Sequence, residues 1–157
     1  MQLETLLTSR LTVSNLQARD AAGAFFEVAE ALVSAAIIQK SSVAAVRDAF
    51  LAREKQGSTS LGFGLAVPHI FCDDVKGVHL LVARSEAGLD LGAVDGRPVK
   101  VLFCIVSAEP HRAEYLAALG AIVRVARDKD YRRLIERSGA AAQVVDCLMQ
   151  GDRALAR

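Results

Sequence analysis

A histidine that directly follows a proline has the clearest chemical potential in this sequence. His69 ends the apolar run GLAVPH, and a segment rich in glycine and hydroxyl side chains, GSTSLGFG at 57–64, comes before it. Glycines in such a segment allow backbone N–H groups and hydroxyls to converge on an anion. A histidine beside an anion cradle can act as a nucleophile, a metal ligand or a general acid or base, or it can be a packed polar residue. The residue alone decides none of these.

The same segment has the composition of a phosphate cradle without the order of a nucleotide-binding loop. The sequence lacks the pattern GxxxxGK[ST], and it also lacks the glycine spacing and the strand-before-loop order of a dinucleotide fingerprint. Nucleotide binding is therefore disfavoured. Arg53, near the end of the preceding predicted helix, can offer a guanidinium fork to phosphoryl oxygens. Its alternative interpretation is a solvated charge at a helix C-terminus.

Length, charge and cysteine content narrow the class of function. The 157 residues fit one domain, expected over 1–150 and followed by a frayed tail at 151–157. Nineteen basic and eighteen acidic residues give a formal net charge of +1, which predicts no nucleic-acid partner. Three widely separated cysteines predict neither a disulfide framework nor a metal site, and no apolar run is long enough for membrane insertion. We therefore expect a cytoplasmic protein.

Apolar periodicity predicts the elements that must position His69. Buried strands are expected at 64–67, 78–85 and 99–108, where Val, Leu and Ile dominate. Helical spacing predicts further elements at 20–38, 43–55, 111–127, 130–137 and 140–149. Helices that come before, between and after buried strands cover a sheet on both faces. The expected fold is an α/β protein, a three-layer α/β/α sandwich with a mixed, mostly buried sheet.

The string REKQGSTSLGFGLAVPH, residues 53–69, resembles the signature of enzyme IIA domains of the fructose, mannitol and nitrogen-regulatory type from the bacterial sugar phosphotransferase system. The resemblance extends from about 20 to 149 and includes DGRPV at 95–99. It implies a phosphoryl carrier whose histidine after the proline, here His69, accepts a phosphoryl group from the phosphocarrier HPr or its nitrogen-branch counterpart. It also implies transfer to a IIB domain or signalling to a regulated target protein, with no metal and no cofactor.

The resemblance further implies roles for the residues before His69. Arg53 would stabilise the transferring phosphoryl group. Gly57, Ser58 and Thr59 would form the phosphate-binding segment, by hydrogen bonding the phosphate or by orienting the ring. The chemistry suits these residue types, because a neutral imidazole nitrogen can attack a phosphohistidine once its other nitrogen is held as an N–H donor.

Two residues depart from the family's pattern. The position that matches the family's second histidine is Tyr115, whose hydroxyl can donate a hydrogen bond but carries no positive charge near neutral pH. His111 lies one helical turn earlier and is a candidate substitute, although it is also explained as a solvated residue at a helix start. Ile70 replaces the glycine that usually follows the active histidine. Its side chain either packs inward or forms part of a docking lip for a partner.

These observations leave more than one function open. A chain without fused IIB or IIC parts favours the nitrogen-regulatory branch over sugar uptake. The alternative is a degenerate IIA-like regulatory module that binds proteins with weak or no phosphotransfer, motivated by Tyr115 and Ile70. An unrelated hydrolase that uses His69 as a general base is disfavoured, because no carboxylate or serine stands at a recognisable triad spacing.

Overall fold

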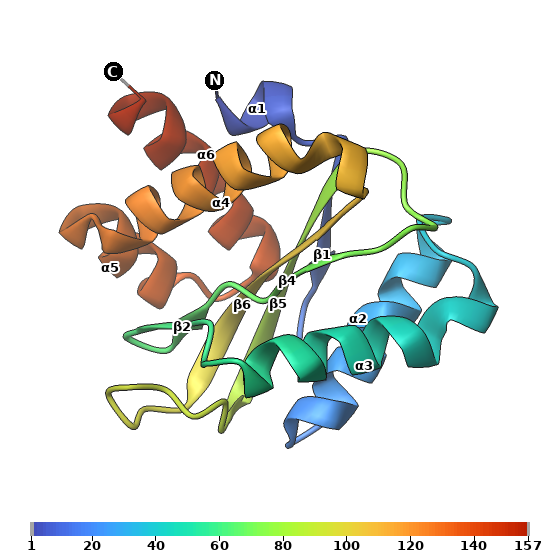
Figure 1. Cartoon of the computed structure of the whole chain (residues 1–157). Helices are drawn as coiled ribbons and strands as arrows, with labels where there is room; N and C mark the ends of the chain where they lie inside the picture. The colour runs from blue at the N-terminus through green and yellow to red at the C-terminus, as the bar shows by residue number, and fades with distance from the viewer. Residues whose placement is uncertain (1, 157) are drawn as a thin grey trace.

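The computed structural model describes residues 2–156, and across them a six-stranded mixed sheet lies between two layers of helices (Figure 1). In chain order the elements, with η for short 3-10 helices, are α1 Leu3–Leu6, β1 Ser9–Val13, α2 Ala21–Ser34, η1 Lys40–Ser42, α3 Val43–Lys55, β2 Ser60–Gly62, β3 Leu65–Ala66, β4 His69–Phe71, β5 Val78–Leu89, β6 Val99–Ser107, η2 Glu109–His111, α4 Arg112–Arg127, α5 Lys129–Arg137 and α6 Ala141–Leu155. The predicted α/β/α sandwich is thus confirmed.

The strand order β1-β5-β6-β3-β2 places the long strands β5 and β6 at the centre of the sheet, where they pair antiparallel. Both β3 and β4 run parallel to β6, with Leu65 opposite Val101 and His69 opposite Ile105. They therefore form one line along β6, interrupted only at Val67 and Pro68. Because proline has no N–H to contribute to a ladder, a break at this point costs the sheet little.

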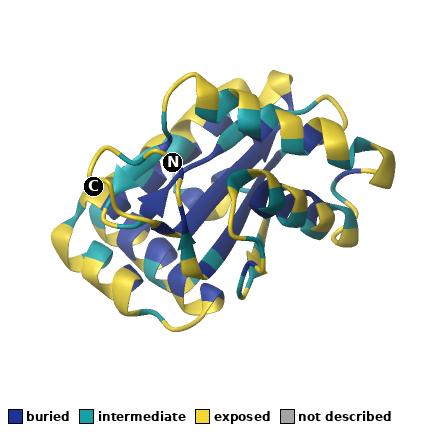
Figure 2. Cartoon of the chain, turned by 90° about the horizontal axis from the view of Figure 1, so that it is seen from below, coloured by how far each residue is buried: buried dark blue, intermediate teal, exposed yellow. Residues whose placement is uncertain are grey.

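Each face of the sheet carries its own apolar core. Helices α1, α4, α5 and α6 pack on one face, and α2 and α3 pack on the other (Figure 1). Figure 2 shows the strands as a buried layer between helices whose outer sides are exposed. On the second face the rings of Phe25 and Phe50 stack with centroids 4.9 Å apart, which joins α2 to α3. Helix α3 is thereby held against the sheet with its last turn near β4.

The C-terminal segment corrects one expectation. The tail predicted to fray from residue 151 instead continues α6 to Leu155, while residue 157 lies outside the described residues. Gly151 is buried, and an added Cβ there would lie 2.6 Å from a Val125 methyl carbon. Asp152 is also buried, and its carboxylate accepts the Leu3 N–H at 2.6 Å. Tertiary contacts to α1 and α4 therefore order the segment.

Other differences concern element ends. The helix predicted over 20–38 begins as expected after Asp20, whose carboxylate accepts the Gly23 N–H at 2.8 Å, but it ends at Ser34. Ala36 then adopts a left-handed φ of 59°, which turns the chain away from the helix axis. No helix within residues 2–156 has the length and apolar character needed to cross a membrane.

Candidate functional site

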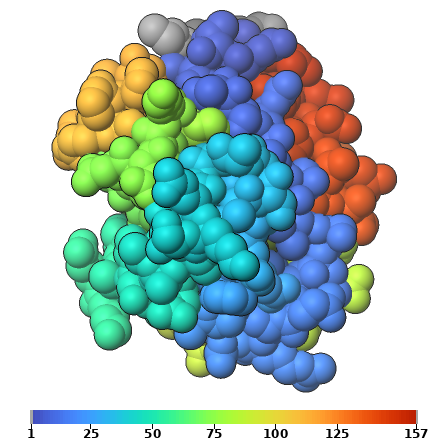
Figure 3. Space-filling view, turned by 90° about the vertical axis from the view of Figure 1, so that its right-hand side faces the viewer, coloured from blue at the N-terminus to red at the C-terminus, as the bar shows by residue number. Residues whose placement is uncertain are grey.

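His69 is the first residue of β4 and lies between the two helical layers. The strand predicted at 64–67 is the short β3, and after Val67 and Pro68 a further strand that was not predicted begins at His69. Its half-buried side chain meets Arg53 from α3 on one side and Tyr115 from α4 on the other. In Figure 3 the green segment that follows β4 reaches the surface between the orange start of α4 and the cyan segment that includes α3. The site is therefore at the surface, where a protein partner can approach.

Hydrogen bonds orient the imidazole ring of His69. Its Nδ1 lies 2.7 Å from the carbonyl oxygen of Val67, which can only accept, so Nδ1 carries the proton. The Arg53 Nε–H points at the other ring nitrogen, Nε2, across 3.4 Å. A guanidinium always donates, so Nε2 presents its lone pair. The geometry thus selects the neutral tautomer in which Nε2 is the nucleophilic atom.

The electrostatic surroundings keep this ring neutral. Burial lowers the pKa of His69 below its ordinary value of 6.5. The bond to the Val67 carbonyl acts in the opposite direction, and the positive charge of Arg53 adds to the lowering. The lone pair on Nε2 is therefore available throughout the neutral pH range.

This environment predicts the pH dependence of the site. We expect His69 to titrate below pH 6.5, so its reaction with a phosphoryl donor should stay constant above that value and fall as the pH drops through the lowered pKa. The free energy of unfolding should fall as the pH drops from 6.5 to the lowered pKa, because in that range the unfolded chain has bound the proton and the folded chain has not. NMR titration of the His69 ring carbons measures the midpoint. A midpoint above 6.5 contradicts the expectation.

Arg53 is held in place by the loop that follows its own helix. Its Nη1 donates to the carbonyl oxygen of Gly57 at 2.9 Å, while its Nε faces His69. Gly57 has a φ of 143°, a conformation that residues with a side chain rarely adopt. The Nη2 group of Arg53 has no hydrogen-bond partner among residues 2–156. It is a free donor next to the nucleophile.

The hydroxyls of Ser58 and Thr59 are engaged within the protein. Ser58 Oγ donates to the carbonyl of Leu91 at 2.9 Å, and Thr59 Oγ1 donates to the carboxylate of Glu54. The backbone N–H of Ser58 donates to no acceptor among residues 2–156. In this arrangement the two side chains shape the segment, while a backbone amide stays available for an anion.

Glu54 is the functional residue that sequence reasoning missed. Its carboxylate also accepts the Thr59 N–H at 3.3 Å, the Thr59 carbonyl accepts the Val67 N–H at 3.0 Å, and the Val67 carbonyl holds His69 Nδ1. A continuous chain of hydrogen bonds therefore leads from Glu54 to the imidazole. One signal was present in the sequence. A carboxylate in the last turn of a helix interacts unfavourably with the helix dipole, so its presence there indicates a favourable interaction elsewhere.

Replacing Glu54 with glutamine tests this chain. A glutamine side chain has one acceptor oxygen for two donors, Thr59 N–H and Oγ1–H, so the loop that carries Val67 should loosen. We expect phosphorylation of His69 to slow by about 10- to 100-fold. The ring nitrogen chemical shifts of His69 should also move away from a single tautomer.

A matched control exists on α2. The carboxylate of Glu27 accepts two backbone N–H groups, from Gln17 at 2.9 Å and Ala18 at 2.8 Å, far along the chain from His69. Glu27→Gln removes the same kind of anchor and should leave both the rate and the tautomer unchanged. Equal losses in the two variants would assign Glu54 a role in folding only.

Tyr115 is buried against the site without adding a charge. Its ring centroid lies 5.9 Å from that of His69 and 4.3 Å from that of Phe71. Burial raises the pKa of Tyr115 to about 12, so the hydroxyl stays protonated and can donate a hydrogen bond. On the outer side the Arg112 guanidinium lies 4.6 Å from the centroid of the Phe71 ring.

The structure separates two other candidates from the nucleophile. His111 is exposed at the end of η2, with Nδ1 4.0 Å from Glu114, and no hydrogen bond joins it to His69 among residues 2–156. The solvated interpretation of His111 therefore fits. Ile70 is 6% exposed and packs into the α2–α3 core, and its φ is not positive. Alternation along β4 directs its side chain away from the face that carries His69, so Ile70 packs inward rather than forming a docking lip.

The described residues fit an anion better than a cation. Within residues 2–156 no group of three or more His, Cys, Asp and Glu side chains is arranged to hold a metal ion. At Nε2 the structure instead places a permanent hydrogen-bond donor, the Arg53 guanidinium. A nucleophilic nitrogen beside a fixed donor is suited to receiving a group that brings negative charge.

Comparison with known proteins connects this geometry to a family. A model of the family described as phosphoenolpyruvate-dependent sugar phosphotransferase system, EIIA 2, matches residues 5–151. The nitrogen regulatory protein of Bradyrhizobium diazoefficiens is 32% identical over 119 residues, which cover 76% of this chain and 78% of that protein. The crystal structure of nitrogen regulatory protein IIA-Ntr from Neisseria meningitidis matches with a TM-score of 0.73 at 27% identity, covering 92% of this chain and 97% of that chain.

A third likeness concerns the fold alone. The IIA mannitol component of Escherichia coli, solved in complex with phosphorylated IIB mannitol, matches with a TM-score of 0.64 at 18% identity. The match covers 96% of this chain and 97% of that chain. The similarity therefore extends over both helical layers and the sheet. The family match also includes every residue of the site around His69.

Proposed function

The chain belongs to the EIIA 2 family of the phosphoenolpyruvate-dependent sugar phosphotransferase system, and from this we propose that His69 is its phosphoryl carrier. Nε2 attacks the phosphorus of a phosphohistidine on an HPr-like donor. The donor's P–N bond breaks as the new bond forms, and the donor nitrogen leaves with the electron pair. The proton on Nδ1 stays on the hydrogen bond to Val67 and is not transferred.

The observation that carries the proposal is the unprotonated Nε2, whose lone pair accepts a long hydrogen bond of 3.4 Å from the Arg53 guanidinium. Phosphoryl transfer needs little covalent help from a protein and depends on positioning and on charge stabilisation. The chain of hydrogen bonds from Glu54 supplies the first, and the Arg53 guanidinium supplies the second. The Tyr115 hydroxyl adds a donor in place of the family's second histidine.

A labelling experiment tests the proposal directly. The chain is mixed with a phosphorylated HPr-like protein of the nitrogen branch and, separately, with phosphorylated HPr, and the products are analysed by intact mass spectrometry. We expect one acid-labile phosphate, located on His69 by peptide mapping under alkaline conditions. Absence of label, while an active IIA protein is labelled in parallel, would refute the carrier function.

We further propose that the chain belongs to the regulatory rather than the sugar-uptake branch. Two of the compared proteins are named nitrogen regulatory proteins. The structural match to one of them, from Neisseria meningitidis, covers 97% of that protein's chain. In that branch the phosphorylated and unphosphorylated forms differ in their affinity for a target protein. The mannitol relative was solved in complex with a IIB partner. A IIB domain is therefore the acceptor whose phosphorylation would distinguish sugar uptake from regulation. Rapid loss of phosphate to a IIB domain would favour sugar uptake.

A second candidate is a protein-binding module that has lost efficient transfer. Tyr115 favours it, because a neutral phenol replaces an ionisable imidazole beside the nucleophile. The two functions predict different affinities for a target. A module without transfer binds equally well as wild type and as His69→Ala. A carrier that signals binds with an affinity that changes on phosphorylation.

A further inference from the structure

A second site of a different kind lies at the other end of β3 and β6. A cavity of about 550 Å³ opens between the tip of the β2–β3 hairpin, the loop that joins β5 to β6, and helix α5. Its lining includes Phe63 and Gly64 of the hairpin, Arg97 and Lys100 of the loop and its strand, and Ile135 of α5. None of the residues around His69 takes part. The volume falls within the range typical of sites for small molecules.

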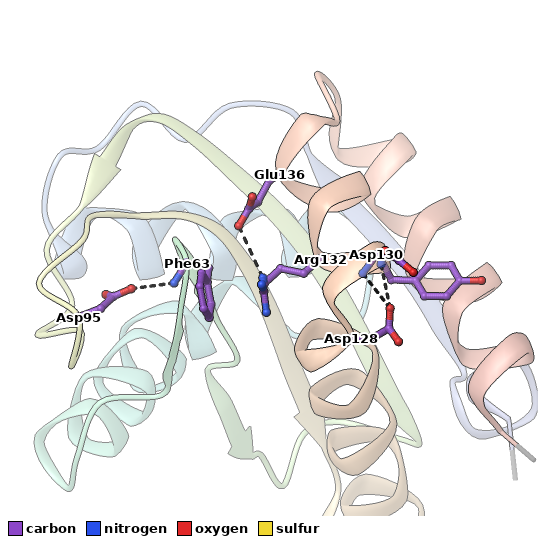
Figure 4. A network of polar contacts seen from close by, with 7 residues as sticks. Phe63, Asp95, Asp128, Asp130, Arg132 and Glu136 are labelled. Atoms are coloured by element: carbon purple, nitrogen blue, oxygen red, sulfur yellow. Dashed lines mark hydrogen bonds and ion pairs between the residues drawn. The ribbon is translucent and has the colours of Figure 1, made fainter.

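The walls of this cavity are fixed by polar contacts (Figure 4). The Asp95 carboxylate accepts the Phe63 N–H at 2.8 Å and the Arg97 N–H at 3.1 Å, so one side chain joins the hairpin tip to the loop. The Arg132 guanidinium lies 3.8 Å from the centroid of the Phe63 ring. At the start of α5 the Asp128 carboxylate caps the helix. Phe63 is thereby held in place although 44% of it is exposed.

Three positively charged side chains line the cavity without forming ion pairs among residues 2–156. They are Arg84, Arg97 and Lys100. Arg84 is oriented by donating to the Gly139 carbonyl at 2.6 Å. Two carboxylates also line the cavity, and that of Glu136 already lies 3.9 Å from Arg132. The remaining charge is positive, which suits an anion.

One buried residue supports this wall. Ser85 lines the cavity but is only 1% exposed, and its oxygen accepts the Gly88 N–H at 3.1 Å. Because this hydroxyl is closed to solvent, the groups that a ligand can reach are the exposed cations and the Phe63 ring.

The other explanation for this end of the molecule is a set of solvated surface charges that bind no ligand. Three observations together weigh against it: the hollow of about 550 Å³, the aromatic ring fixed in its wall and the cations in its lining that form no ion pair among residues 2–156. A phosphate ester matches them, because its oxygens accept from guanidinium and ammonium groups while its organic part can lie on a ring. We propose that this cavity binds a small phosphate ester, with the phosphate on Arg97 and Lys100 and the organic part against Phe63.

Titration of the full-length chain with defined probes tests the proposal. The probes are AMP, ribose 5-phosphate, inorganic phosphate and adenosine, observed by two-dimensional NMR at constant ionic strength. We expect saturable shifts at Gly64, Ser85 and Lys100 with the two esters and none with adenosine. Tighter binding of AMP than of ribose 5-phosphate would identify the organic part as a base stacked on Phe63, and equal binding would identify it as a sugar.

The variants compare two exposed cation pairs. Arg97→Ala with Lys100→Ala should weaken ester binding by about 10-fold or more, as expected for the loss of hydrogen bonds to a charged group. Arg10→Ala with Arg153→Ala removes two cations from a different cavity and should change nothing. Shifts that do not saturate, shifts centred on His69, or equal binding by the two double variants would each overturn the proposal. Binding is read directly, so the result does not depend on phosphorylation of His69.

Discussion

The variant His69→Gln is expected to take up no phosphate from a phosphorylated HPr-like donor. A glutamine side chain can still donate to the Val67 carbonyl in place of Nδ1, but it has no nucleophilic nitrogen. Because the histidine is only half-buried and has no role in either core, the free energy of unfolding should change by no more than about 1 kcal/mol. Intact mass spectrometry and thermal unfolding, run on the same sample, measure the two effects.

His111→Gln is the matched control for this variant. It replaces an exposed histidine whose only described ion pair is a 4.0 Å approach to Glu114. The control should be labelled at the wild-type rate. Label on His69→Gln, or loss of label in the control, would place the acceptor elsewhere than at His69.

The second large effect is expected from Arg53→Gln. The change removes the donor that faces Nε2 at 3.4 Å and the bond that ties the side chain to Gly57. Loss of one fixed donor at a site of developing charge lowers a rate by about 10²- to 10³-fold. Arg53→Lys should recover little of this loss, because a lysine cannot make both contacts from one planar group. Stopped-flow or quenched-flow labelling measures the rate.

A second readout separates charge stabilisation from packing. The positive charge of Arg53 contributes to the lowering of the His69 pKa, so Arg53→Gln should raise that pKa as well as slow the transfer. Arg47→Gln on the same helix is the control, since Arg47 pairs with its neighbour Asp48 at 2.9 Å. An unchanged His69 pKa in Arg53→Gln would mean that the guanidinium acts only through the shape of the loop.

The longer elements of the fold could be predicted from local patterns. Strands β5 and β6 are recognisable in the sequence as nearly continuous apolar runs, and helix α4 is recognisable from apolar residues at helical spacing. The strands β1 and β2 carry no such signal. β1 lies at an edge of the sheet and is only partly buried, and β2 has three residues whose pairing with β3 depends on a hairpin. Contacts made after folding, not local preference, determine these short elements.

The site could be predicted in part. The spacing of the motif placed Arg53 with His69, and the family pattern placed Tyr115 beside them, as the structure has them. The position of His111 relative to the site depends on where η2 ends and α4 begins, which helical periodicity alone does not resolve. Glu54 was missed because it acts on His69 through hydrogen bonds to backbone groups, and such bonds leave no residue pattern in a sequence.

The phenol of Tyr115 has a consequence for how the protein responds to its surroundings. Burial raises the pKa of Tyr115 to about 12, and a guanidinium keeps its positive charge throughout the biological range. His69 is therefore the one member of this trio that titrates, and burial places its pKa below 6.5. Between neutral and moderately alkaline conditions the electrical balance around the nucleophile is constant. Its degree of loading should then follow the supply of phosphoryl donor and be insensitive to drifts in acidity.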